Sequence, residues 1–469
     1  MMEPLTLQRI AECVGGELSS SPATTVRRVV TDSRQVRPGD LFVALAGERF
    51  DGHAFLGPAF EQGAVAAMGE HGRCALPLPD RPLVQVRSSR EALGRLAAAY
   101  RRDFQLPVIA VAGSNGKTTV KETLATVLRR RLRTLASAAS FNNDIGVPLT
   151  LLELEREHRV AVVEAGTNHP GELAALLRLI EPRYGVLTSL GREHLEFFGN
   201  LAGVVEEEGC LAEAVHPEGC LFVNADVPGV DAVVRRTRAR VVRVGWKAGA
   251  DWRVVEAGVH ETATRFRVEA PQPEFSGEYA VPLLGVHQVV AAALTVAVAA
   301  ELGLSPVEVT RGLAGCSPAP HRLQARAGGD VLLLDDTYNA NLDSVRAALE
   351  TLRDVAGERR KVAILGDMAE LGAASEADHA AAGEAAAFCG VDLLIALGAR
   401  REGVAGAARE AGVPDVRAWA TPDAAGREVA GLLQPGDVVL LKASRASRLE
   451  RLVESLEHEL AAPRPADRH

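Results

Sequence analysis

Runs of apolar residues alternate with amphipathic stretches along the middle of the chain. Residues 108–112 (VIAVA) form a continuous apolar run, which is typical of a strand buried on both faces of a parallel sheet. The next stretch has apolar residues at helical spacing, at Val120, Leu124, Val127 and Leu128. Further strands are expected at 160–166, 185–191, 221–224 and 240–245, with helical patterns between most of them. This repetition predicts βαβ units and a parallel sheet.

The same pattern occurs before and after this region, so we predict three α/β domains. The first has strands at 27–31, 40–45 and 83–86 and helices at 53–62 and 88–101. The third follows a Pro-rich boundary at 315–320 and has strands at 330–334, 361–365, 392–397 and 437–441. Residues 101–107 are expected to form a linker, and residues 252–284 antiparallel hairpins. The predicted domains are 1–103, 104–316 and 317–469.

Composition agrees with a globular chain and excludes several functions. The 469 residues are 47% apolar, which allows each domain a core of its own. Aromatic residues make up only 4% and the formal net charge is −9, so we expect no binding to nucleic acid. The six cysteines form no Cys-x-x-Cys pair, which argues against a zinc site or a disulfide framework.

The N-terminus and the longest apolar stretch argue against secretion and membrane insertion. Residues 1–10 lack a basic segment followed by an apolar core. The apolar stretch at 281–300 contains His287 and Gln288, so a buried helix is expected there rather than a membrane span. We therefore expect a cytoplasmic protein without stable membrane insertion.

The clearest motif follows the strand at 108–112 and begins the next helix. It consists of Gly113, Ser114, Asn115, Gly116, Lys117, Thr118 and Thr119. Glycines let the backbone approach phosphate closely, and the N–H groups of a helix N-terminus favour an anion. In such a loop the lysine reaches the terminal phosphates and the Thr118 hydroxyl holds Mg²⁺. Val111 stands where the full Walker pattern has glycine, so the motif is a shortened variant. The alternative is a glycine-rich turn without a ligand, but the flanking strand and helix favour phosphate.

Polar residues at the ends of other predicted strands indicate a cleft between the second and third domains. These residues are Glu164, His194, Asp335, Asp336, Asp367 and Lys442. Ligands of open α/β sheets bind beyond the carboxyl ends of the strands, so these side chains are expected to face a common ligand. A structural role stays open for Glu164 and His194, because a buried strand-end residue can also be satisfied by a protein partner.

Glu208 is a further candidate metal ligand. It shares an apolar helical stripe with Val204, Leu211 and Val215, whereas residues 206 and 207 fall off that stripe. A carboxylate on a buried face is either paired or bound to a metal.

Two polar segments allow a structural or a binding role. The turn at 31–34 is either an Asx turn or a site for a second phosphorylated ligand. The basic residues at 129–133 end the helix of the phosphate motif, and the helix dipole accounts for them better than nucleic-acid binding does.

Several segments together resemble the Mur ligase family, the ATP-dependent amide ligases of peptidoglycan synthesis. They are 113–119 (GSNGKTT), 141–150 (FNNDIGVPLT), 194–199 (HLEFFG), 335–341 (DDTYNAN) and 363–372 (AILGDMAELG). The resemblance extends over nearly the whole chain. It implies a small α/β N-terminal domain for a UDP-sugar, a central P-loop ATPase domain and a Rossmann-like C-terminal domain. The segment 338–341 (YNAN) is similar to the branch that joins D-alanyl-D-alanine to UDP-N-acetylmuramoyl-tripeptide.

The resemblance also implies roles for individual residues. It implies nucleotide binding by residues 113–119 together with His287, Arg322, Asp336 and Asn339. It implies Mg²⁺ ligands at Thr118, Glu164, His194 and Glu208, and catalytic roles for Lys117, Glu164, His194 and Arg322. It places uridine diphosphate at Ser33 and Arg34, the UDP-sugar path at Asn142 and Asn143, and the dipeptide at Lys442 and Ser444.

Three positions depart from the family pattern. Glu208 stands where the family commonly has a carbamoylated lysine, and Cys210 where it has a nearby glutamate. His287 is followed by Gln288 instead of asparagine. Glu208 is therefore either a direct substitute ligand or the sign of a weakened second metal site.

The resemblance implies a reaction that uses ATP and Mg²⁺. The tripeptide carboxylate attacks the γ-phosphate, and the amine of D-alanyl-D-alanine then attacks the acyl phosphate. We expect a monomer. The alternatives are another Mur-type or folylpolyglutamate-type ligase, a P-loop phosphohydrolase or kinase, and a nucleotide-binding module without catalysis.

Overall fold

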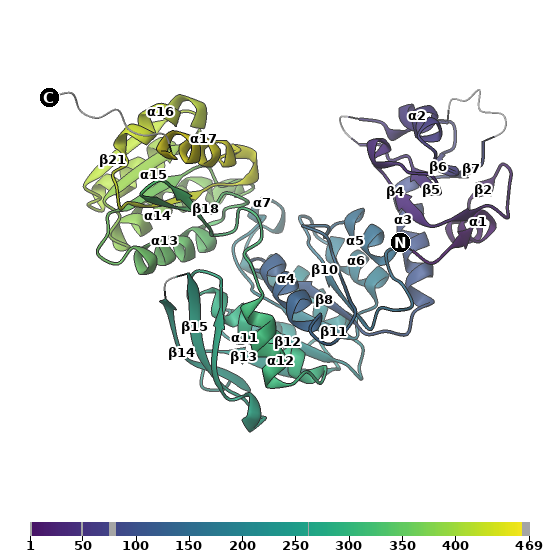
Figure 1. The fold of residues 1–469 in the computed structure, drawn as a ribbon, viewed down its shortest axis with the longest axis horizontal. Coiled ribbons are helices and arrows are strands. Elements are labelled where there is room, and N and C mark those ends of the chain that lie inside the picture. Colours follow the sequence, from purple (N-terminus) through teal and green to yellow (C-terminus); the bar gives the residue numbers. More distant parts are fainter. Residues whose placement is uncertain (1, 48–49, 75–80, 261, 462–469) are drawn as a thin grey trace.

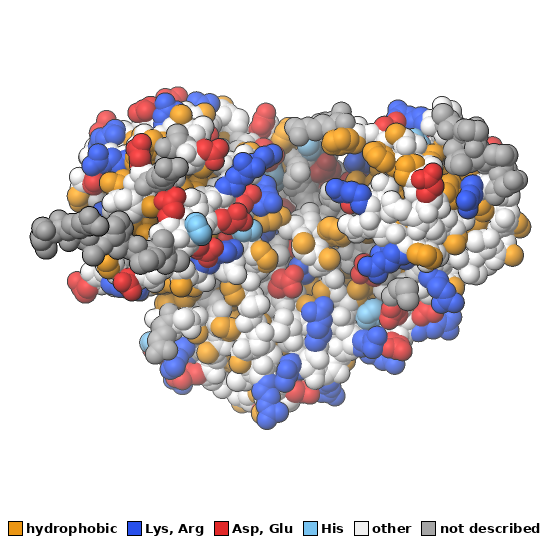
Figure 2. Space-filling view, turned by 45° about the horizontal axis from the view of Figure 1, so that its top comes forward, with side chains coloured by type: hydrophobic (Ala, Val, Ile, Leu, Met, Phe, Trp, Pro, Cys, Tyr) orange, Lys and Arg blue, Asp and Glu red, His pale blue; other side chains and the backbone are white. Residues whose placement is uncertain are grey.

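The computed structural model describes residues 2–47, 50–74, 81–260 and 262–461. Three main sheets, each with helices packed against it, follow one another along the chain (Figure 1). The predicted α/β fold with three domains is confirmed. Figure 2 shows acidic and basic side chains interspersed over the visible face rather than gathered into one basic surface.

The N-terminal domain contains a five-stranded sheet and a two-stranded ribbon. The sheet has the order β2 (Glu17–Leu18), β7 (Leu83–Val86), β6 (Ala66–Glu70), β5 (Asp40–Val43) and β4 (Arg28–Val30), and only β2 is antiparallel to its neighbour. The ribbon pairs β1 (Leu5–Thr6) with β3 (Thr25–Val26). The helices are α1 (Leu7–Val14), α2 (Leu56–Glu61) and α3 (Ser89–Arg102). Helix α3 begins after Ser88, whose side chain accepts from the Glu91 N–H, as an N-cap serine does.

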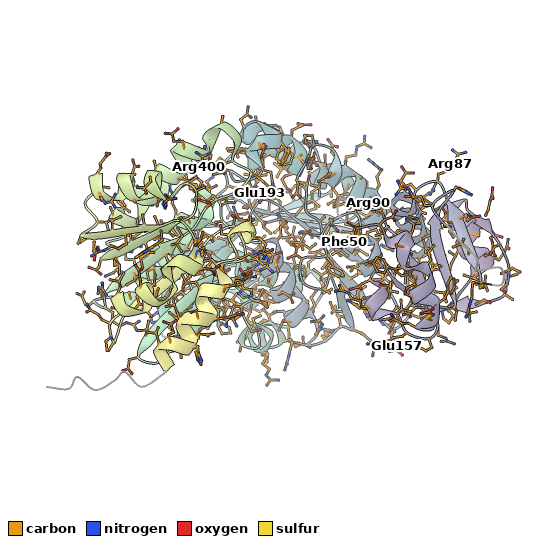
Figure 3. All side chains as sticks on the ribbon, turned by 90° about the horizontal axis from the view of Figure 1, so that it is seen from above. Phe50, Arg87, Arg90, Glu157, Glu193 and Arg400 are labelled. Carbon is orange, nitrogen blue, oxygen red and sulfur yellow. The ribbon has the colours of Figure 1, made fainter. Side chains whose placement is uncertain are left out.

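The predicted linker at 101–107 is a packed connection rather than a loose one. Arg101 is buried and donates to the carbonyls of Phe104 and Ile180, because a buried guanidinium needs acceptors. The Tyr100 hydroxyl donates to the carbonyl of Leu154 at 2.6 Å. Arg90, labelled in Figure 3, pairs with Asp144 at 2.7 Å across the same boundary. These contacts fix the N-terminal domain against the central one.

The central domain contains a nine-stranded sheet with β8 (Val108–Ala112) among its parallel strands. Its order is β16 (Gly277–Val281), β15 (Ala263–Glu269), β14 (Trp252–His260), β13 (Arg240–Gly245), β12 (Cys220–Asn224), β11 (Tyr184–Leu187), β8, β10 (Val160–Glu164) and β9 (Thr134–Ala136). Strands β14, β15 and β16 pair antiparallel, as expected for 252–284, and they extend the parallel sheet.

Helices cover both faces of the central sheet. One hydrophobic core contains residues of α4 (Lys117–Leu128), α11 (Gln288–Glu301) and α12 (Pro306–Ala314). Another contains residues of α3, α5 (Gly146–Leu151), α6 (Glu172–Ile180), α9 (Cys210–Ala214) and α10 (Val230–Val234). The apolar stretch at 281–300 contains the buried helix α11, as predicted. None of the helices in the described part of the chain is long and apolar enough to cross a membrane.

The C-terminal domain contains a six-stranded sheet, five strands of which are parallel. Its order is β17 (Gln324–Gly328), β18 (Val331–Asp336), β22 (Val438–Lys442), β19 (Lys361–Leu365), β20 (Leu393–Leu397) and β21 (Asp415–Trp419). Only β17 is antiparallel to its neighbour. The helices are α13 (Leu342–Ala356), α14 (Ser375–Phe388), α15 (Arg401–Glu410), α16 (Pro422–Leu432) and α17 (Glu450–Ala461). The carboxyl ends of β18 and β22 carry Asp336 and Lys442 toward the central domain.

Candidate active site

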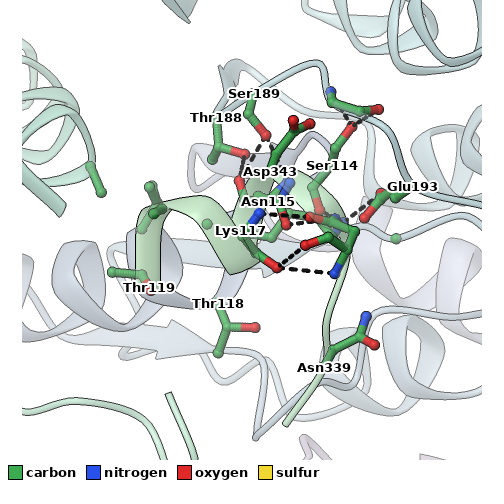
Figure 4. Close-up of a pocket in the computed structure, with 18 of the residues that line it drawn as sticks. Ser114, Asn115, Lys117, Thr118, Thr119, Thr188, Ser189, Glu193, Asn339 and Asp343 are labelled. Carbon is green, nitrogen blue, oxygen red and sulfur yellow. Dashed lines mark hydrogen bonds and ion pairs between the residues drawn. The ribbon is translucent and has the colours of Figure 1, made fainter. Parts of the chain in front are cut away.

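A cavity of about 780 Å³ lies between the central and C-terminal domains. A volume of this size suits a nucleotide-sized ligand. The central domain lines it with residues 114–119, Glu164, Glu193 and His194, and the C-terminal domain with Arg322, Asp336, Asn339 and Lys442. Figure 4 shows the start of α4 with Glu193 and Asn339 in this cavity. The expected cleft between the two domains is therefore present.

The turn between β8 and α4 needs glycine at two positions. Gly113 has a φ of +122°, and a Cβ there would lie 2.5 Å from Oγ1 of Thr188. Gly116 has a φ of +82° and is the N-cap of α4. Both conformations are readily available only to glycine. The turn thereby presents the N-terminus of α4 to the cavity, where N–H groups favour an anion.

Lys117 lies at the start of α4, and its ammonium contacts two backbone carbonyls and one carboxylate. Its Nζ donates to the carbonyls of Gly113 and Ser114 and lies 3.3 Å from Oε1 of Glu193. Burial acts to lower the pKa of Lys117, but the negative charges of Glu193 and two further glutamates outweigh burial and raise this pKa. The raised pKa favours a positive charge on this side chain, which lies beside the turn (Figure 4).

Glu164 ends the buried strand β10 and has one oxygen available for a cation. Its Oε1 accepts from the Thr118 hydroxyl at 3.2 Å and from the Asn142 amide at 2.8 Å. Its Oε2 is buried and has no hydrogen-bond partner within the described residues. An unpartnered carboxylate oxygen beside a threonine hydroxyl suits Mg²⁺, which prefers oxygen ligands.

A magnesium ion here would need ligands from outside the protein. Across the described ranges, no three His, Cys, Asp or Glu side chains are grouped closely enough to hold a metal by themselves. Mg²⁺ commonly takes one or two protein carboxylates and completes its shell with phosphate and water. The side chains present fit that mode of binding.

Arg322 reaches from the C-terminal domain to residues 113–119, the turn and helix start that we call the phosphate turn. Its Nη2 donates to Oγ1 of Thr118 at 3.1 Å, and its guanidinium lies 4.2 Å from the centre of the Tyr338 ring. The neighbours His321 and Leu323 both have a left-handed backbone, with φ of +60° and +47°. Such strain is maintained only where the surroundings over-determine the conformation, as they often do at functional sites.

Asp336 and Lys442 form an ion pair at the carboxyl ends of adjacent strands. Lys442 Nζ contacts Oδ2 of Asp336 and donates to the carbonyl of Asn339 at 3.1 Å. Oδ1 of Asp336 accepts from the N–H of Leu323 at 3.2 Å. Lys442 is almost fully buried, so in this arrangement its charge holds the 336–339 segment in place.

The three domains match known families in the same order. Residues 25–101 match the Mur ligase family, catalytic domain; residues 111–299 match the Mur ligase middle domain; and residues 321–445 match the Mur ligase, glutamate ligase domain. Together these matches span most of the chain. This chain belongs to the Mur ligase family.

Individual Mur ligases resemble the chain over nearly its whole length. It is 36% identical to the UDP-N-acetylmuramoyl-tripeptide–D-alanyl-D-alanine ligase of Escherichia coli (strain K12), over 97% of this chain and 99% of that one. The structure of MurF from Acinetobacter baumannii has a TM-score of 0.89 at 32% identity and covers 97% of this chain and 99% of that chain. MurF ligase from Thermotoga maritima in complex with ADP has a TM-score of 0.81 at 30% identity, with 93% and 98% coverage.

The predicted nucleotide and metal residues of this Mur ligase mostly meet in the cavity. Those that line it are 114–119, Glu164, His194, His287, Arg322, Asp336 and Asn339. Gly113 lies directly behind them, and its carbonyl accepts from Lys117.

Glu208 lies apart from the cavity lining, beneath the phosphate turn. It ends α8 (Leu201–Glu208), is almost fully buried, and faces the N–H of Gly113 and the ammonium of Lys117. Burial raises the pKa of Glu208 to about 8, although Lys117 favours the charged form. The adjacent Glu207 is also buried, contrary to its position off the predicted stripe. It accepts from the N–H groups of Gly171 and Leu173 at the start of α6.

The substrate residues expected from the sequence lie in different places. Asn142 and Asn143 line the cavity, and Asn143 also accepts from the N–H of Gly146 at the start of α5. Ser33 and Arg34 lie in the N-terminal domain, where the Arg34 guanidinium forms two hydrogen bonds with Asp32.

Three other expected residues of the C-terminal domain do not line the cavity. Ser444 is buried, and its N–H donates to the carbonyl of Asp367 at 3.0 Å. The Asp367 carboxylate accepts from the N–H groups of Ala399 and Arg400, in the turn after β20. Asp335 is buried and accepts from the Thr337 hydroxyl at 2.7 Å. Ser444 and Asp367 therefore stabilise the turns at the strand ends, and Asp335 also pairs with His321 and Arg326.

Sequence reasoning missed several residues that line the site. Glu193 contacts Lys117, although only its neighbour His194 was expected to do chemistry. Asn341 donates to Oδ1 of Asn115 at 3.0 Å, and the Tyr338 hydroxyl donates to Oγ of Ser140 at 2.7 Å. Tyr338 and Asn341 belong to the DDTYNAN segment, so the motif itself was the available signal, whereas nothing in the sequence marks Ser140.

Proposed function

We propose that this Mur ligase uses ATP to join D-alanyl-D-alanine to UDP-N-acetylmuramoyl-tripeptide, through an acyl phosphate. The structural observation on which the proposal rests is that Arg322 of one domain donates to Thr118 of another inside the cavity. Relatives that cover almost the whole chain and have this activity in their names support the choice of substrates. Most residues expected to bind nucleotide line the same space.

Charge neutralisation is the main task of such a site. Two like charges about 4 Å apart repel by roughly 4 kcal/mol at an effective dielectric of about 20. Lys117 and Arg322 approach the cavity from opposite domains and would offset the repulsion between the carboxylate and the triphosphate. When bound at Thr118, Glu164 and His194, Mg²⁺ would neutralise further phosphate charge. Glu208 would act on Lys117 from behind the turn, or as a further metal ligand.

The other assignments belong to the same proposal. Ser33 and Arg34 would contact uridine diphosphate, Asn142 and Asn143 the sugar-linked peptide, and Lys442 and Ser444 the dipeptide side of the site. The domains would divide at 103/104 and 316/317, which agrees with the grouping of strands into sheets. The protein would act as a cytoplasmic monomer.

Product analysis tests the proposal. Purified protein with UDP-muramoyl tripeptide, ATP, Mg²⁺ and D-alanyl-D-alanine should yield the pentapeptide and ADP, measured by mass spectrometry. Lys117→Ala should reduce both products by at least about 1,000-fold, because it removes the positive charge beside the phosphates. Lys247→Ala, at an exposed lysine, is the matched control and should be unaffected. ATP hydrolysis that needs no amine would instead indicate a phosphohydrolase, and products with single amino acids another ligase.

A further inference from the structure

The segment 191–196 enters the cavity from the central domain but is held by acidic residues of the C-terminal domain. The N–H of Arg192 donates to Oδ2 of Asp343 at 3.0 Å, and the Arg192 guanidinium pairs with Asp378 at 3.0 Å. The carboxylate of Glu370 contacts Nδ1 of His194. Figure 3 shows Glu193, in the middle of this segment, between the C-terminal domain and the central sheet.

The contact between His194 and Glu370 joins two residues in unusual backbone conformations. His194 has a φ of +50° and Glu370 a φ of +59°. Left-handed conformations cost free energy in residues other than glycine, so local packing must maintain both. The backbones also meet here, because the N–H of Glu196 donates to the carbonyl of Glu370 at 3.3 Å.

The same segment contacts the phosphate turn on its other side. The N–H of Gly191 donates to Oγ of Ser114 at 2.8 Å, and Glu193 lies 3.3 Å from the ammonium of Lys117. A short stretch of chain therefore connects three acids of the C-terminal domain with Ser114 and Lys117 of the central domain. Any shift of the C-terminal domain would move His194 relative to Lys117.

We propose that Glu370 is a positioning residue, which orients His194 from the C-terminal domain and thereby couples domain docking to Mg²⁺–nucleotide binding. Because Glu370 occupies Nδ1, only Nε2 of the His194 imidazole is left for a metal. A histidine that binds metal commonly has its other nitrogen fixed by a carboxylate in this way. The coupling is reciprocal, so Mg²⁺ and nucleotide would also favour docking of the domain. The proposal rests on the proposed function of the cavity as the ATP site.

Calorimetric titration of the full-length protein with ADP tests this coupling, with Mg²⁺ and with EDTA. Mg²⁺ should tighten ADP binding to the wild type. In Glu370→Ala this increase in ADP affinity should be about tenfold smaller, while the ADP affinity measured in EDTA stays unchanged. Glu370→Gln keeps an acceptor oxygen but not the charge and should fall between the two. Glu384→Ala, at an exposed residue in the middle of α14, is the matched control and should match the wild type.

Steady-state kinetics give a second readout. Glu370→Ala should lower kcat about tenfold and leave the KM for the UDP-linked substrate unchanged, because the residues proposed to contact that substrate belong to the N-terminal and central domains. Wild-type Mg²⁺-dependent affinity in both Glu370 variants would overturn the proposal. If the wild type binds Mg²⁺ and ADP but forms no pentapeptide, the proposed function fails, and the titration still decides the role of Glu370.

Discussion

Two buried carboxylates face one ammonium at the phosphate turn, Glu193 from the cavity side and Glu208 from beneath. Glu193 lies 3.3 Å from Lys117, and Glu208 faces the same ammonium from the end of α8. One positive charge cannot fully compensate two buried negative charges, so part of the desolvation cost remains. Burial accordingly raises the pKa of Glu193 and, to about 8, that of Glu208.

The raised pKa of Glu208 predicts that the contribution of this residue to stability falls as the pH rises. Below about pH 4.5 the group is protonated in both states, and between pH 4.5 and about 8 it ionises only in the unfolded chain. The folded state then binds more protons, so its stability falls over this window, by on the order of a few kcal/mol for this group. Glu208→Gln cannot ionise and should therefore gain in melting temperature over the wild type as the pH rises from 4.5 to 8.

Thermal unfolding in EDTA at a series of pH values measures this difference without bound metal. Glu206→Gln, at an exposed residue of the same helix, is the matched control and should follow the wild-type curve. If the curves of Glu208→Gln and the wild type stay parallel over the whole window, Glu208 ionises as readily in the folded protein as in the unfolded chain.

At the scale of elements, an alanine substitution in the turn between β8 and α4 tests whether the turn requires glycine. In Gly113→Ala, the new Cβ would lie 2.5 Å from Oγ1 of Thr188 on a φ of +122°. A clash and a strained backbone together predict a loss of about 2–4 kcal/mol in the free energy of unfolding and at least tenfold weaker ADP binding. Denaturant titration and calorimetry measure the two effects.

Gly249→Ala provides the matched control for this substitution. A Cβ added at Gly249 would have no atom within 4 Å, and the backbone there is not left-handed. The stability and ADP affinity of this variant should therefore stay within about 0.5 kcal/mol of the wild type. Equal behaviour of the two alanine variants would mean that the turn tolerates a side chain at Gly113.

Strong periodicity made some elements predictable, and its absence hid others. The strands at 240–245 and 361–365 occur at the predicted residues, because the first contains valine at 241, 242 and 244 and the second is aliphatic from 362 to 365. Strands β9 and β21 were not predicted, since β9 has three residues and β21 is only partly buried. The predicted stripe at 204, 208, 211 and 215 is buried throughout. The prediction for Glu207 was wrong because its carboxylate accepts from the N–H groups of Gly171 and Leu173 at the start of α6, a contact that helical spacing cannot reveal.

At the scale of the whole molecule, the site depends on contacts that no local pattern reveals. Arg322 and Thr118 are 204 residues apart in the chain, and the sequence predicted only that both face the nucleotide, not that they contact each other. The Tyr338–Ser140 and Asn341–Asn115 pairs join the same two domains and were not predicted. Strand-end chemistry predicted that a cleft exists, but only the docking of the domains determines which side chains meet across it.

The hydrogen bond between Tyr338 and Ser140 should make a small contribution to docking of the C-terminal domain on the central domain, which can be measured apart from the contribution of the Tyr338 ring. Tyr338→Phe removes the hydroxyl that donates to Ser140 and keeps the ring against Arg322, whose guanidinium lies 4.2 Å from the ring centre. A neutral hydrogen bond contributes about 1 kcal/mol, so kcat/KM for the dipeptide should fall about fivefold. Tyr338→Ala also removes the ring that packs against the Arg322 guanidinium and should reduce kcat/KM by more than about tenfold.

A double-mutant cycle decides whether this hydrogen bond is the cause. Ser140→Ala alone should have the same effect as Tyr338→Phe, because each removes one partner of the same bond. The double variant should then be no worse than either single variant, since the interaction can be lost only once. Effects that add in the double variant would show that the two side chains act independently, and that docking of the C-terminal domain relies on Asn341 and Arg322 instead.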